Sequence, residues 1–427
     1  MPELSADSWS PSLIVYVRPS DPRRTAIAAY GESFRAVLGE IAGVESVDLL
    51  PADLTETIDS RAARRAVEDF VDRALRDLPR AGDRDNPPIV HAEMGNACHR
   101  EFWAAHRLQE HLPHARFYCT VHDPPTLCSN PYRYIDAEFE GKSPLRLLNT
   151  ALTKAAETLV DRMKRRVEKR FVRRCEGLIA LSKGGVEAMR RHSLFRGARL
   201  HRLDLVCPLE SLDPAYRARM TPASSNGAGE FVTTFFGFIS PGKGIRTLID
   251  AFGILVERVE NEGGVVRPRL LIFGGVAGNP KAEAYVSTLR RRIERSPHAE
   301  RIAFAPGFVD DAERDRRLAR SHVLVLPFRT APGVVSASGS VIQAMSLGKA
   351  IVATRSNTLE EEISDGVTGL LCPEGDAGAL ADRLCALARD PALRQRLGQN
   401  ARRHIQTEHA PSAIAATLES IYRTEAK

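Results

Sequence analysis

Short apolar segments alternate with longer segments of helical periodicity along this chain, and the alternation occurs twice. Each apolar segment has the length of a strand and is apolar on both faces, which is typical of strands buried inside a parallel sheet. The segments of the first half begin at Ser12, Pro88, Arg116, Gly177 and Leu200, and those of the second half begin at Val232, Pro268, Arg301, His322, Lys349 and Gly369. The pattern predicts an α/β fold with two doubly wound, Rossmann-like parallel sheets.

The stretch between the two halves, residues 211–231, is rich in Ser, Pro, Gly and Asn and has no periodicity. This composition is typical of a linker, so we predict an amino-terminal domain over residues 1–212, a linker over 213–230 and a carboxyl-terminal domain over 231–408. Ligands of doubly wound sheets bind beyond the carboxyl ends of the strands. We therefore expect a ligand site that draws residues from both domains.

The charge of the chain excludes few partners. Its 427 residues include 60 Lys and Arg and 54 Asp and Glu, which gives a net charge of +6. This excess is too small to indicate nucleic acid, and we expect no nucleic-acid partner. It suits an anionic small ligand and an anionic membrane surface equally well.

The cysteines and the amino terminus indicate the compartment. The chain has 7 cysteines, scattered without CxxC spacing or paired histidines, which argues against a disulfide framework and against a zinc site. The first residues lack the basic and apolar regions of a signal peptide, and no apolar run is long enough to span a membrane. We expect reduced thiols and a cytoplasmic protein.

Two loops in the second half have the composition of phosphate sites. The first, residues 237–244, reads GFISPGKG and lies between a predicted strand and a predicted helix. Its glycines allow backbone N–H groups to approach an anion, and Lys243 adds a charge. The second, SASGS, offers Ser338, Gly339 and Ser340 at the start of a short predicted helix. Each loop alone is also compatible with an ordinary strand-to-helix turn.

Residues 160–174 combine many Lys and Arg side chains with an apolar stripe at Val160, Met163, Val167 and Phe171, which predicts a basic amphipathic helix. One interpretation is a solvated helix whose stripe packs on the amino-terminal sheet. The other is a patch that binds anionic lipid headgroups or an anionic acceptor. The second interpretation would place the protein peripherally at the inner face of the plasma membrane.

The order of these elements resembles the nucleotide-sugar-binding half of the family-4 glycosyltransferases, over about residues 231–422. The matching segments, in that family's order and spacing, are GFISPGKGIRTLIDAF, LLIFGGVAGN, IAFAPGFVDD, HVLVLPF, SGSVIQAMSLGKAIVAT, LEEEISDGVTGLLCPEGD and LRQRLGQNARRHI. The resemblance implies the GT-B architecture of two facing Rossmann-like domains. It also implies that the last helix, within about residues 409–427, crosses back to the amino-terminal domain.

The resemblance further implies the roles of individual residues. Lys243 would stabilise the donor diphosphate as it departs, and the nucleotide base would stack near Gly307 and Phe308. The other donor-side positions that it implies are Gly237, Gly244, Ser338, Gly339, Ser340, Gln343 and Glu361. A lysine with preorganised N–H groups can stabilise the charge of a leaving diphosphate, so neither a metal nor another cofactor is expected.

Two positions depart from the family's pattern. Phe238 replaces an arginine that usually follows the first glycine of the opening loop. Of the family's paired glutamates, the first aligns with Val335 and the second, which holds the ribose, aligns with Gln343. Gln343 can still form hydrogen bonds with a diol but brings no charge. We interpret the Ser338-Gly339 loop as a subfamily variation, with loss of catalysis as the alternative.

The amino-terminal half resembles the family more faintly. His91 and His122 each lie at the end of a predicted strand, and Asp123 follows His122. A strand-end histidine is often structural, but the resemblance implies that His122 orients the hydroxyls of the donor sugar. We assign His91 to the acceptor side; Asp123 could contact the acceptor or orient the imidazole of His122. Arg18, Arg23 and Arg24, in a loop after the first strand, could contact an anionic acceptor or be merely solvated.

These features together predict a metal-independent glycosyltransferase of the hexosyltransferase type, and the family resemblance implies that it retains the anomeric configuration. It would use a nucleoside-diphosphate sugar and a hydroxyl acceptor (a sugar, a glycolipid or a small molecule) in glycan, polysaccharide or glycolipid assembly. One alternative is a catalytically silent GT-B protein that binds nucleotide sugars as a partner or sensor, as Val335 and Phe238 would allow. A sugar phosphorylase is a further alternative, although it would need more cationic residues for free phosphate.

Overall fold

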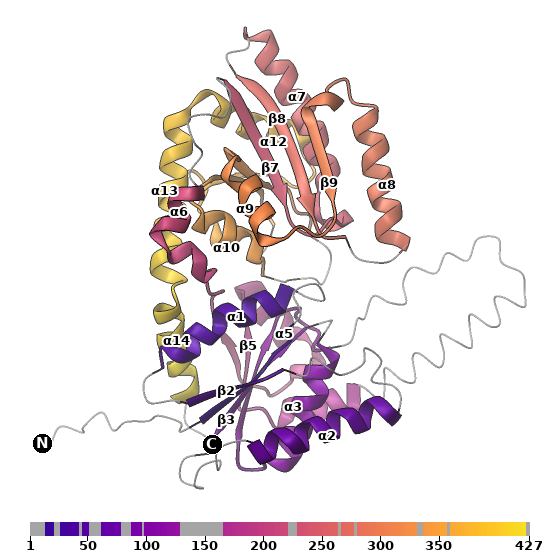
Figure 1. The fold of residues 1–427 in the computed structure, drawn as a ribbon, viewed down its shortest axis with the longest axis vertical. Helices are drawn as coiled ribbons and strands as arrows, with labels where there is room; N and C mark the ends of the chain where they lie inside the picture. The colour runs from indigo at the N-terminus through magenta and orange to yellow at the C-terminus, as the bar shows by residue number, and fades with distance from the viewer. Residues whose placement is uncertain are drawn as a thin grey trace, which may run out of the picture. The chain divides into compact units, whose positions relative to one another are not determined.

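The structure is a computed structural model. It describes residues 13–20, 26–41, 45–50, 61–77, 87–95, 98–128, 165–220, 229–263, 266–276, 280–330, 335, 337–356 and 359–423. The chain divides into two compact units (Figure 1). Unit 1 comprises residues 1–204, 333–337 and 414–427, and unit 2 comprises residues 205–332 and 338–413.

Unit 1 contains a six-stranded, parallel sheet in the order β2-β1-β3-β4-β5-β6. Its strands are β1 (Leu13–Val17), β2 (Glu45–Leu49), β3 (Ile89–Met94), β4 (Arg116–Val121), β5 (Gly177–Ala180) and β6 (Leu200–Arg202). Its helices are α1 (Ala26–Gly39), α2 (Arg61–Asp77), α3 (His99–His111), 165–173, α5 (Lys183–Arg191), the short η2 (Ser193–Phe195) and most of α14 (Pro411–Arg423). The strands predicted for this half are confirmed.

Strand β2 is an additional strand that the apolar pattern does not predict. Its sequence, ESVDL, is largely polar, and only Leu49 is fully buried. The strand lies at the edge of the sheet and pairs with β1 alone among the described strands. An edge strand covers less of the core than a central one, so its residues need not be apolar on both faces.

Unit 2 contains a second six-stranded, parallel sheet, in the order β12-β11-β10-β7-β8-β9. Its strands are β7 (Glu230–Phe236), β8 (Arg267–Gly274), β9 (Ile302–Pro306), β10 (Val323–Leu326), β11 (Ala350–Thr354) and β12 (Leu370–Cys372). Its helices are α6 (Pro214–Met220), α7 (Ile245–Asn261), α8 (Pro280–Glu294), α9 (Asp311–Ala319), α10 (Gly339–Ser346), α11 (Leu359–Glu362), α12 (Ala377–Arg389) and α13 (Pro391–Glu408). Three short 3₁₀ helices are η3 (Leu209–Leu212), η4 (Pro241–Lys243) and η5 (Ala299–Arg301).

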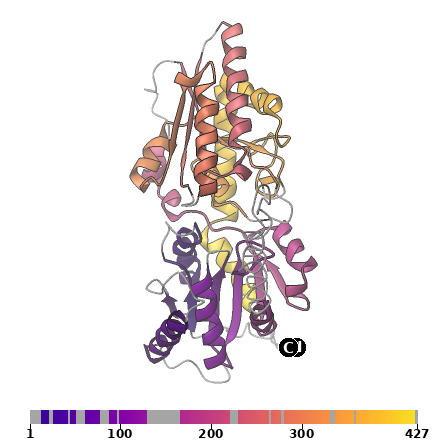
Figure 2. The same ribbon diagram turned by 90° about the vertical axis from the view of Figure 1, so that its right-hand side faces the viewer.

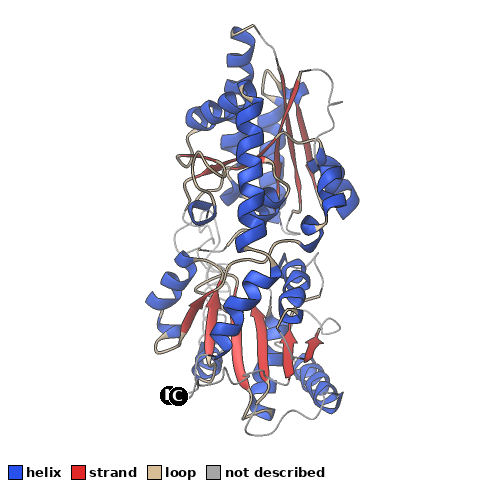
Figure 3. Ribbon diagram, turned by 90° about the vertical axis from the view of Figure 1, so that its left-hand side faces the viewer, coloured by secondary structure: helices blue, strands red, loops and turns tan. Residues whose placement is uncertain are grey.

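Helices lie on both faces of each sheet, as the doubly wound pattern predicts (Figures 2 and 3). Interior strands of each sheet are buried on both faces: all residues of β1, β3, β10 and β11 are buried. Burying both faces requires the continuous apolar runs that the sequence shows. None of the described helices combines the length and apolar character needed to cross a bilayer.

The division into units differs in detail from the predicted domain limits. Unit 2 begins at Leu205, and part of the predicted linker forms helix α6. The hydroxyl of Tyr216 on α6 donates to Asp315 Oδ1 on α9 at 3.0 Å, which fixes the helix to unit 2. Residues 221–228 of the predicted linker lie outside the described residues.

The carboxyl-terminal helix returns to unit 1, as expected. Residues of α14 from Ile414 onward belong to unit 1, whereas α13 belongs to unit 2. Tyr422 on α14 is fully buried and packs edge-on against Tyr118 of β4, with ring centroids 4.8 Å apart. The final helix is therefore part of the core of unit 1.

Candidate active site

The sheet of unit 2 has a topological switch point between β7 and β10, because the chain proceeds from β7 through β8 to β9 and then returns to the opposite side of β7. Loops that leave neighbouring strands at such a point diverge to opposite faces, and ligands of doubly wound sheets bind in the crevice that results. The two predicted phosphate loops follow β7 and β10. The fold therefore brings them together at this position.

Contacts between the loops confirm that they meet. The backbone N–H of Arg329, after β10, donates to the carbonyl of Gly242 at 2.8 Å. A Cβ at Gly244, whose φ is +64°, would lie 1.7 Å from the carbonyl oxygen of Pro327. The close approach and the positive φ both require glycine at position 244.

Lys243 lies in η4 at the centre of this junction. Its Nζ lies 3.6 Å from the centroid of the Phe328 ring, a cation–π contact with the loop that follows β10. Desolvation by burial lowers the pKa of Lys243 to about 8. The ammonium is thus partly withdrawn from water and would gain from an anionic partner.

The start of α10 supplies backbone donors beside the β7 loop. A Cβ at Gly237, whose φ is +144°, would lie 3.3 Å from Ser340 Oγ, so the two predicted sites are adjacent. In the described structure the Ser338 side chain does not cap α10. The first N–H groups of a helix have no intrahelical acceptor and carry the positive end of the helix dipole. This helix start can therefore bind an anion.

The glycine turns after β7, β8 and β9 form a continuous edge. Gly307 N–H donates to the carbonyl of Gly274 at 2.9 Å, and Ile239 N–H donates to that of Gly275 at 2.8 Å. Two large apolar side chains are exposed along this edge: Phe238 at 46% and Phe308 at 63%. Phe238, where the family usually has arginine, instead lies over Gly275.

The remaining donor-side residues lie on the neighbouring elements. Gln343 and Ser340 line a narrow crevice behind α10 together with Phe236. Glu361 is on α11, which follows β11, the neighbour of β10 in the sheet. Val335 is described, whereas Ser336 and residues 331–334 lie outside the described residues.

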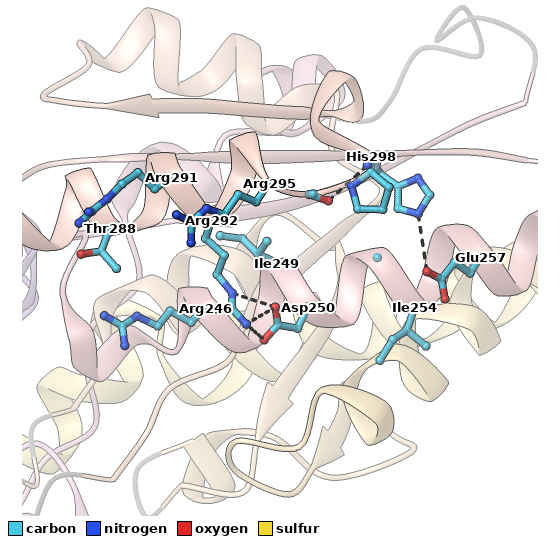
Figure 4. Close-up of a pocket in the computed structure, with 13 residues that line it drawn as sticks. Arg246, Ile249, Asp250, Ile254, Glu257, Thr288, Arg291, Arg292, Arg295 and His298 are labelled. Atoms are coloured by element: carbon cyan, nitrogen blue, oxygen red, sulfur yellow. Dashed lines mark hydrogen bonds and ion pairs between the residues drawn. The ribbon is translucent and has the colours of Figure 1, made fainter.

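A larger hollow of about 590 Å³ lies elsewhere in unit 2, between α7 and α8 (Figure 4). Arg292 reaches across it to Asp250, with Nη2 to Oδ2 at 2.6 Å, and His298 faces Glu257 (Figure 4). The described residues that line this hollow include none of the predicted site residues. The predicted site residues of unit 2 lie instead on the loops at the switch point and on the elements next to them.

In unit 1, His122 lies at the end of β4 and is anchored by a buried glutamate. Its Nε2 lies 2.6 Å from Glu93 Oε2, and the hydroxyl of Tyr16 donates to Glu93 Oε1 at 2.8 Å. The side chain of Glu93 is fully buried, whereas that of His122 is 11% exposed. Burial, followed by the charge of Glu93, raises the pKa of Tyr16 well above its usual value, so Tyr16 remains a donor.

A ring contact fixes the other side of His122. Tyr30 of α1 lies edge-on to the imidazole, with centroids 4.9 Å apart. Asp123 Oδ2 lies beside Gly95, at the end of the neighbouring strand β3, where a Cβ would approach it to 3.0 Å. Sequence reasoning did not identify Glu93 or Tyr30. The signal for Glu93 was a carboxylate within the largely apolar strand PIVHAEM.

His91 does not take the acceptor-side position predicted for it. It is fully buried in unit 1, and its ring nitrogens form hydrogen bonds with the hydroxyls of Tyr422, at 2.6 Å, and Thr120, at 2.8 Å. Burial lowers the pKa of His91 to about 4, so the ring is neutral. The histidine ends in the core because position 91 lies within β3, with Glu93 and Met94 still to follow.

Arg18 is likewise structural in the described chain. It is 1% exposed and forms ion pairs at 2.9 Å with Glu32 and with Asp48. A buried, doubly paired guanidinium is not available to an acceptor. All seven cysteines are free, in agreement with the expectation of thiols.

Comparisons with known proteins agree with this geometry. Residues 230–390 match the family described as glycosyl transferases group 1. The α-D-kanosaminyltransferase of Streptomyces kanamyceticus is 24% identical over 65% of this chain and 68% of its own. A D-inositol 3-phosphate glycosyltransferase of Kribbella flavida is 30% identical over 53% of this chain and 52% of its own. The chain thus spans about half the length of that relative.

Solved structures are similar over nearly the whole chain. Sucrose-phosphate synthase from Thermosynechococcus elongatus has a TM-score of 0.62 at 18% identity, covering 96% of this chain and 98% of its own. The Anabaena protein HepE in complex with UDP has a TM-score of 0.62 at 15% identity, covering 97% and 100%. At such identities these similarities show the fold alone.

The two parallel Rossmann-like sheets and the similar solved structures show a two-domain fold of the GT-B type, and residues 230–390 match a domain of the group 1 glycosyl transferases. Apart from residues 333–337, which belong to unit 1, the group 1 match falls within unit 2, the unit that contains Lys243 and the start of α10.

Proposed function

We propose that this protein transfers a sugar from a nucleoside-diphosphate sugar to a hydroxyl acceptor. The observation that carries the proposal is the convergence of Lys243, the turn at Gly237 and the start of α10 at the switch point of unit 2. A cation and the backbone donors at the start of a helix suit a diphosphate. HepE, a structural neighbour, binds UDP and UDP-glucose, which supports a nucleotide-sugar donor.

The proposed chemistry follows from the leaving group. The bond between the anomeric carbon and the diphosphate oxygen breaks, and negative charge develops on that oxygen. Lys243 and the N–H groups at the start of α10 stabilise this charge, so we propose a reaction that needs no metal. The acceptor hydroxyl attacks from the face that the diphosphate leaves and gives its proton to the departing oxygen, which retains the anomeric configuration.

The other residues are assigned to binding and orientation. Gln343 hydrogen-bonds the ribose, Phe308 stacks on the base, and Glu361 contacts the donor. His122, whose Nε2 lies 2.6 Å from Glu93 Oε2, orients the hydroxyls of a hexose. The acceptor is a sugar, a glycolipid or a small molecule, and the setting is glycan, polysaccharide or glycolipid assembly.

The test begins with the donor. Thermal unfolding is measured with UDP, GDP and their sugars, since a bound nucleotide stabilises the folded state by mass action. Transfer and donor hydrolysis are then measured with the nucleotide that binds. Lys243→Ala should lower kcat/KM by about 100- to 1,000-fold, roughly 3 kcal/mol of transition-state stabilisation.

The matched control is Lys281→Ala, which removes an exposed lysine from the first turn of α8 and should leave kcat/KM unchanged. Near-normal transfer by Lys243→Ala would contradict the role of Lys243. Nucleotide binding with neither transfer nor hydrolysis would support the silent partner or sensor instead. Phosphate-dependent release of a sugar phosphate would indicate a phosphorylase.

We also propose that the basic helix, where it is described, contacts anionic membranes only through its charges. Arg165, Arg166, Lys169 and Arg170 are exposed, but Phe171 is fully buried in the core of unit 1. The described part of the apolar stripe, Val167 and Phe171, packs on the core of unit 1 and is not available to insert into lipid. Arg162, Val160 and Met163 lie outside the described residues. Sedimentation with anionic vesicles, with the four exposed basic residues neutralised, tests this contact.

A further inference from the structure

Among the described residues, three side chains of unit 2 that the proposed transfer does not use converge behind α11. Glu362 ends α11, His404 lies on α13, and His409 is the C-cap residue of α13. One potential ligand atom from each lies within 4.8 Å of the other two. The rings of His404 and His409 have centroids 5.4 Å apart and are nearly perpendicular.

The hydrogen bond of His409 fixes which nitrogen faces the carboxylate. His409 Nδ1 lies 2.6 Å from the backbone oxygen of Leu205. A carbonyl oxygen only accepts, so Nδ1 carries the proton and donates it. In the neutral ring, Nε2 then has a lone pair, and this atom lies 3.3 Å from Glu362 Oε2.

Two electron-pair donors thus face each other out of reach of water. The side chains of His409 and Glu362 are 2% and 6% exposed. Buried acceptors that face each other are unfavourable unless a positive species lies between them, either a proton or a metal ion. His404, which is half-buried, adds a third ligand where a proton would need only two.

We propose that Glu362, His404 and His409 bind a divalent transition-metal ion, with zinc as the best match. Zinc accepts imidazole nitrogen and carboxylate oxygen at about 2.0–2.2 Å in tetrahedral geometry, which separates neighbouring ligand atoms by about 3.3 Å. The spacing of His409 Nε2 and Glu362 Oε2 is 3.3 Å. Imidazole ligands favour zinc over magnesium or calcium. Water would occupy the fourth position.

The Leu205 carbonyl acts as the outer partner that metal-bound histidines commonly have, because it orients the ring and fixes its tautomer. A second bond, from Cys207 N–H to the carbonyl of His409 at 2.9 Å, holds the same two segments together. The ion would join α11, α13 and residues 205–207. The proposed transfer uses none of its three ligands, so the site is compatible with a transfer reaction that uses no metal.

The inference also bears on the proposed function, because Glu362 follows Glu361 on the same short helix. A metal that holds Glu362 would fix the turn that presents Glu361. The binding test below does not depend on that link, since it measures the metal and not the transfer.

The experiment uses the full chain without an affinity tag, stripped of metal with a chelator and dialysed against Zn²⁺. Bound zinc is measured by elemental analysis and by competition with a chromophoric chelator. We expect about one tightly bound Zn²⁺ per chain, and visible absorption bands of tetrahedral Co²⁺ when cobalt replaces zinc. His404→Ala and Glu362→Gln should each weaken zinc binding by about 100-fold or more.

His298→Ala is the matched control, because His298 faces one carboxylate, Glu257, at 4.0 Å and belongs to no such three-residue group in the described chain. It should retain full zinc affinity. His404→Ala removes a half-buried residue, so circular dichroism can confirm that this variant is folded. Failure of the wild-type chain to retain zinc, or equal affinity in His404→Ala, would overturn the proposal and leave an imidazolium–carboxylate pair.

Discussion

Lys243 lies against the Phe328 ring in a partly desolvated position, and this lowers its pKa to about 8. The proposed diphosphate contact needs the charged form. As the pH rises through about 8, the free protein loses that charge, so the affinity for UDP should fall by up to about tenfold per pH unit. Calorimetric titration of UDP between about pH 7.5 and 9.5 measures the slope.

Lys243→Arg is the control for this titration, because a guanidinium stays charged throughout the range. Its UDP affinity should be nearly flat with pH, even if binding is weaker overall. Equal slopes in wild type and Lys243→Arg would mean that Lys243 does not supply the titrating charge.

Glu93 is a positioning residue for His122, on the evidence of the 2.6 Å contact and the complete burial of its carboxylate. Glu93→Gln removes the charged acceptor and frees the imidazole to turn. We expect kcat to fall by about 10- to 100-fold, as misplacement of an orienting group does. The Kd for UDP should not change, because the diphosphate loops belong to unit 2.

Tyr16→Phe is the matched variant, since it removes the other hydrogen bond of Glu93 and leaves the contact with His122. It should lower the free energy of unfolding by about 1 kcal/mol with little effect on kcat. Equal losses of kcat in both variants would show that Glu93 matters for packing and not for the orientation of His122.

The sequence predicts some of these residues and not others for a physical reason. Lys243 and Gly244 belong to a local pattern, a glycine turn between strand and helix, so their roles depend on neighbours in sequence. Glu93 and His91 lie two residues apart on β3 but have different partners, which come from β1, β4 and α14. Tertiary contacts were therefore needed to distinguish His91, a buried structural histidine, from His122, which is partly exposed and held by Glu93.

At the scale of elements, the junction of the β7 and β10 loops depends on Gly244. Gly244→Ala places a Cβ where the Pro327 carbonyl lies, at 1.7 Å, and in a left-handed conformation with φ of +64°. The loops must separate, so we expect a loss of about 1–3 kcal/mol in the free energy of unfolding and weaker UDP binding. Urea unfolding and calorimetry measure the two effects.

Gly242→Ala is a stringent control in the same loop. In the described structure, a Cβ at Gly242 would meet nothing within 4 Å, and this glycine does not have a positive φ. The variant should therefore be close to wild type in stability and UDP affinity. If Gly242→Ala lowered stability and UDP affinity as much as Gly244→Ala does, the flexibility of the loop in general, and not the contact with Pro327, would explain both losses.

The elements themselves were largely predictable, because buried parallel strands are continuous apolar runs. Strand β2 was not, since an edge strand with the sequence ESVDL lacks that signal. Helix α6 was also missed: its seven residues lie in a stretch rich in Pro and Ser, and Tyr216 and Met220 provide too short an apolar face to show a period.

At the scale of the whole molecule, α14 contributes a hydrogen bond to the core of unit 1. Tyr422→Phe would leave His91 Nδ1 without its 2.6 Å partner in a fully buried position. We expect unit 1 to lose about 1–3 kcal/mol of stability and unit 2 to be unaffected. Hydrogen exchange of amides in β3 and β4, compared with β7 and β8, measures each unit separately.

Tyr285→Phe, on α8 of unit 2, provides the control, because Tyr285 is also largely buried but belongs to the other unit. It should leave exchange in β3 and β4 unchanged. Faster exchange throughout both units of Tyr422→Phe would indicate that they unfold as one body, contrary to this prediction.

The place of Tyr422 has a consequence for biosynthesis. A ribosome makes residues 205–413, which include all of unit 2, before it makes the tyrosine that completes the hydrogen bonds of His91 in unit 1. The sheet of unit 1 is therefore translated first, but its core is completed last. While all of unit 2 is being synthesised, His91 of the nascent chain lacks its hydrogen bond with Tyr422. If translation stopped before the final helix, unit 1 would therefore lack part of its core, although the residues next to the missing helix in sequence belong to unit 2.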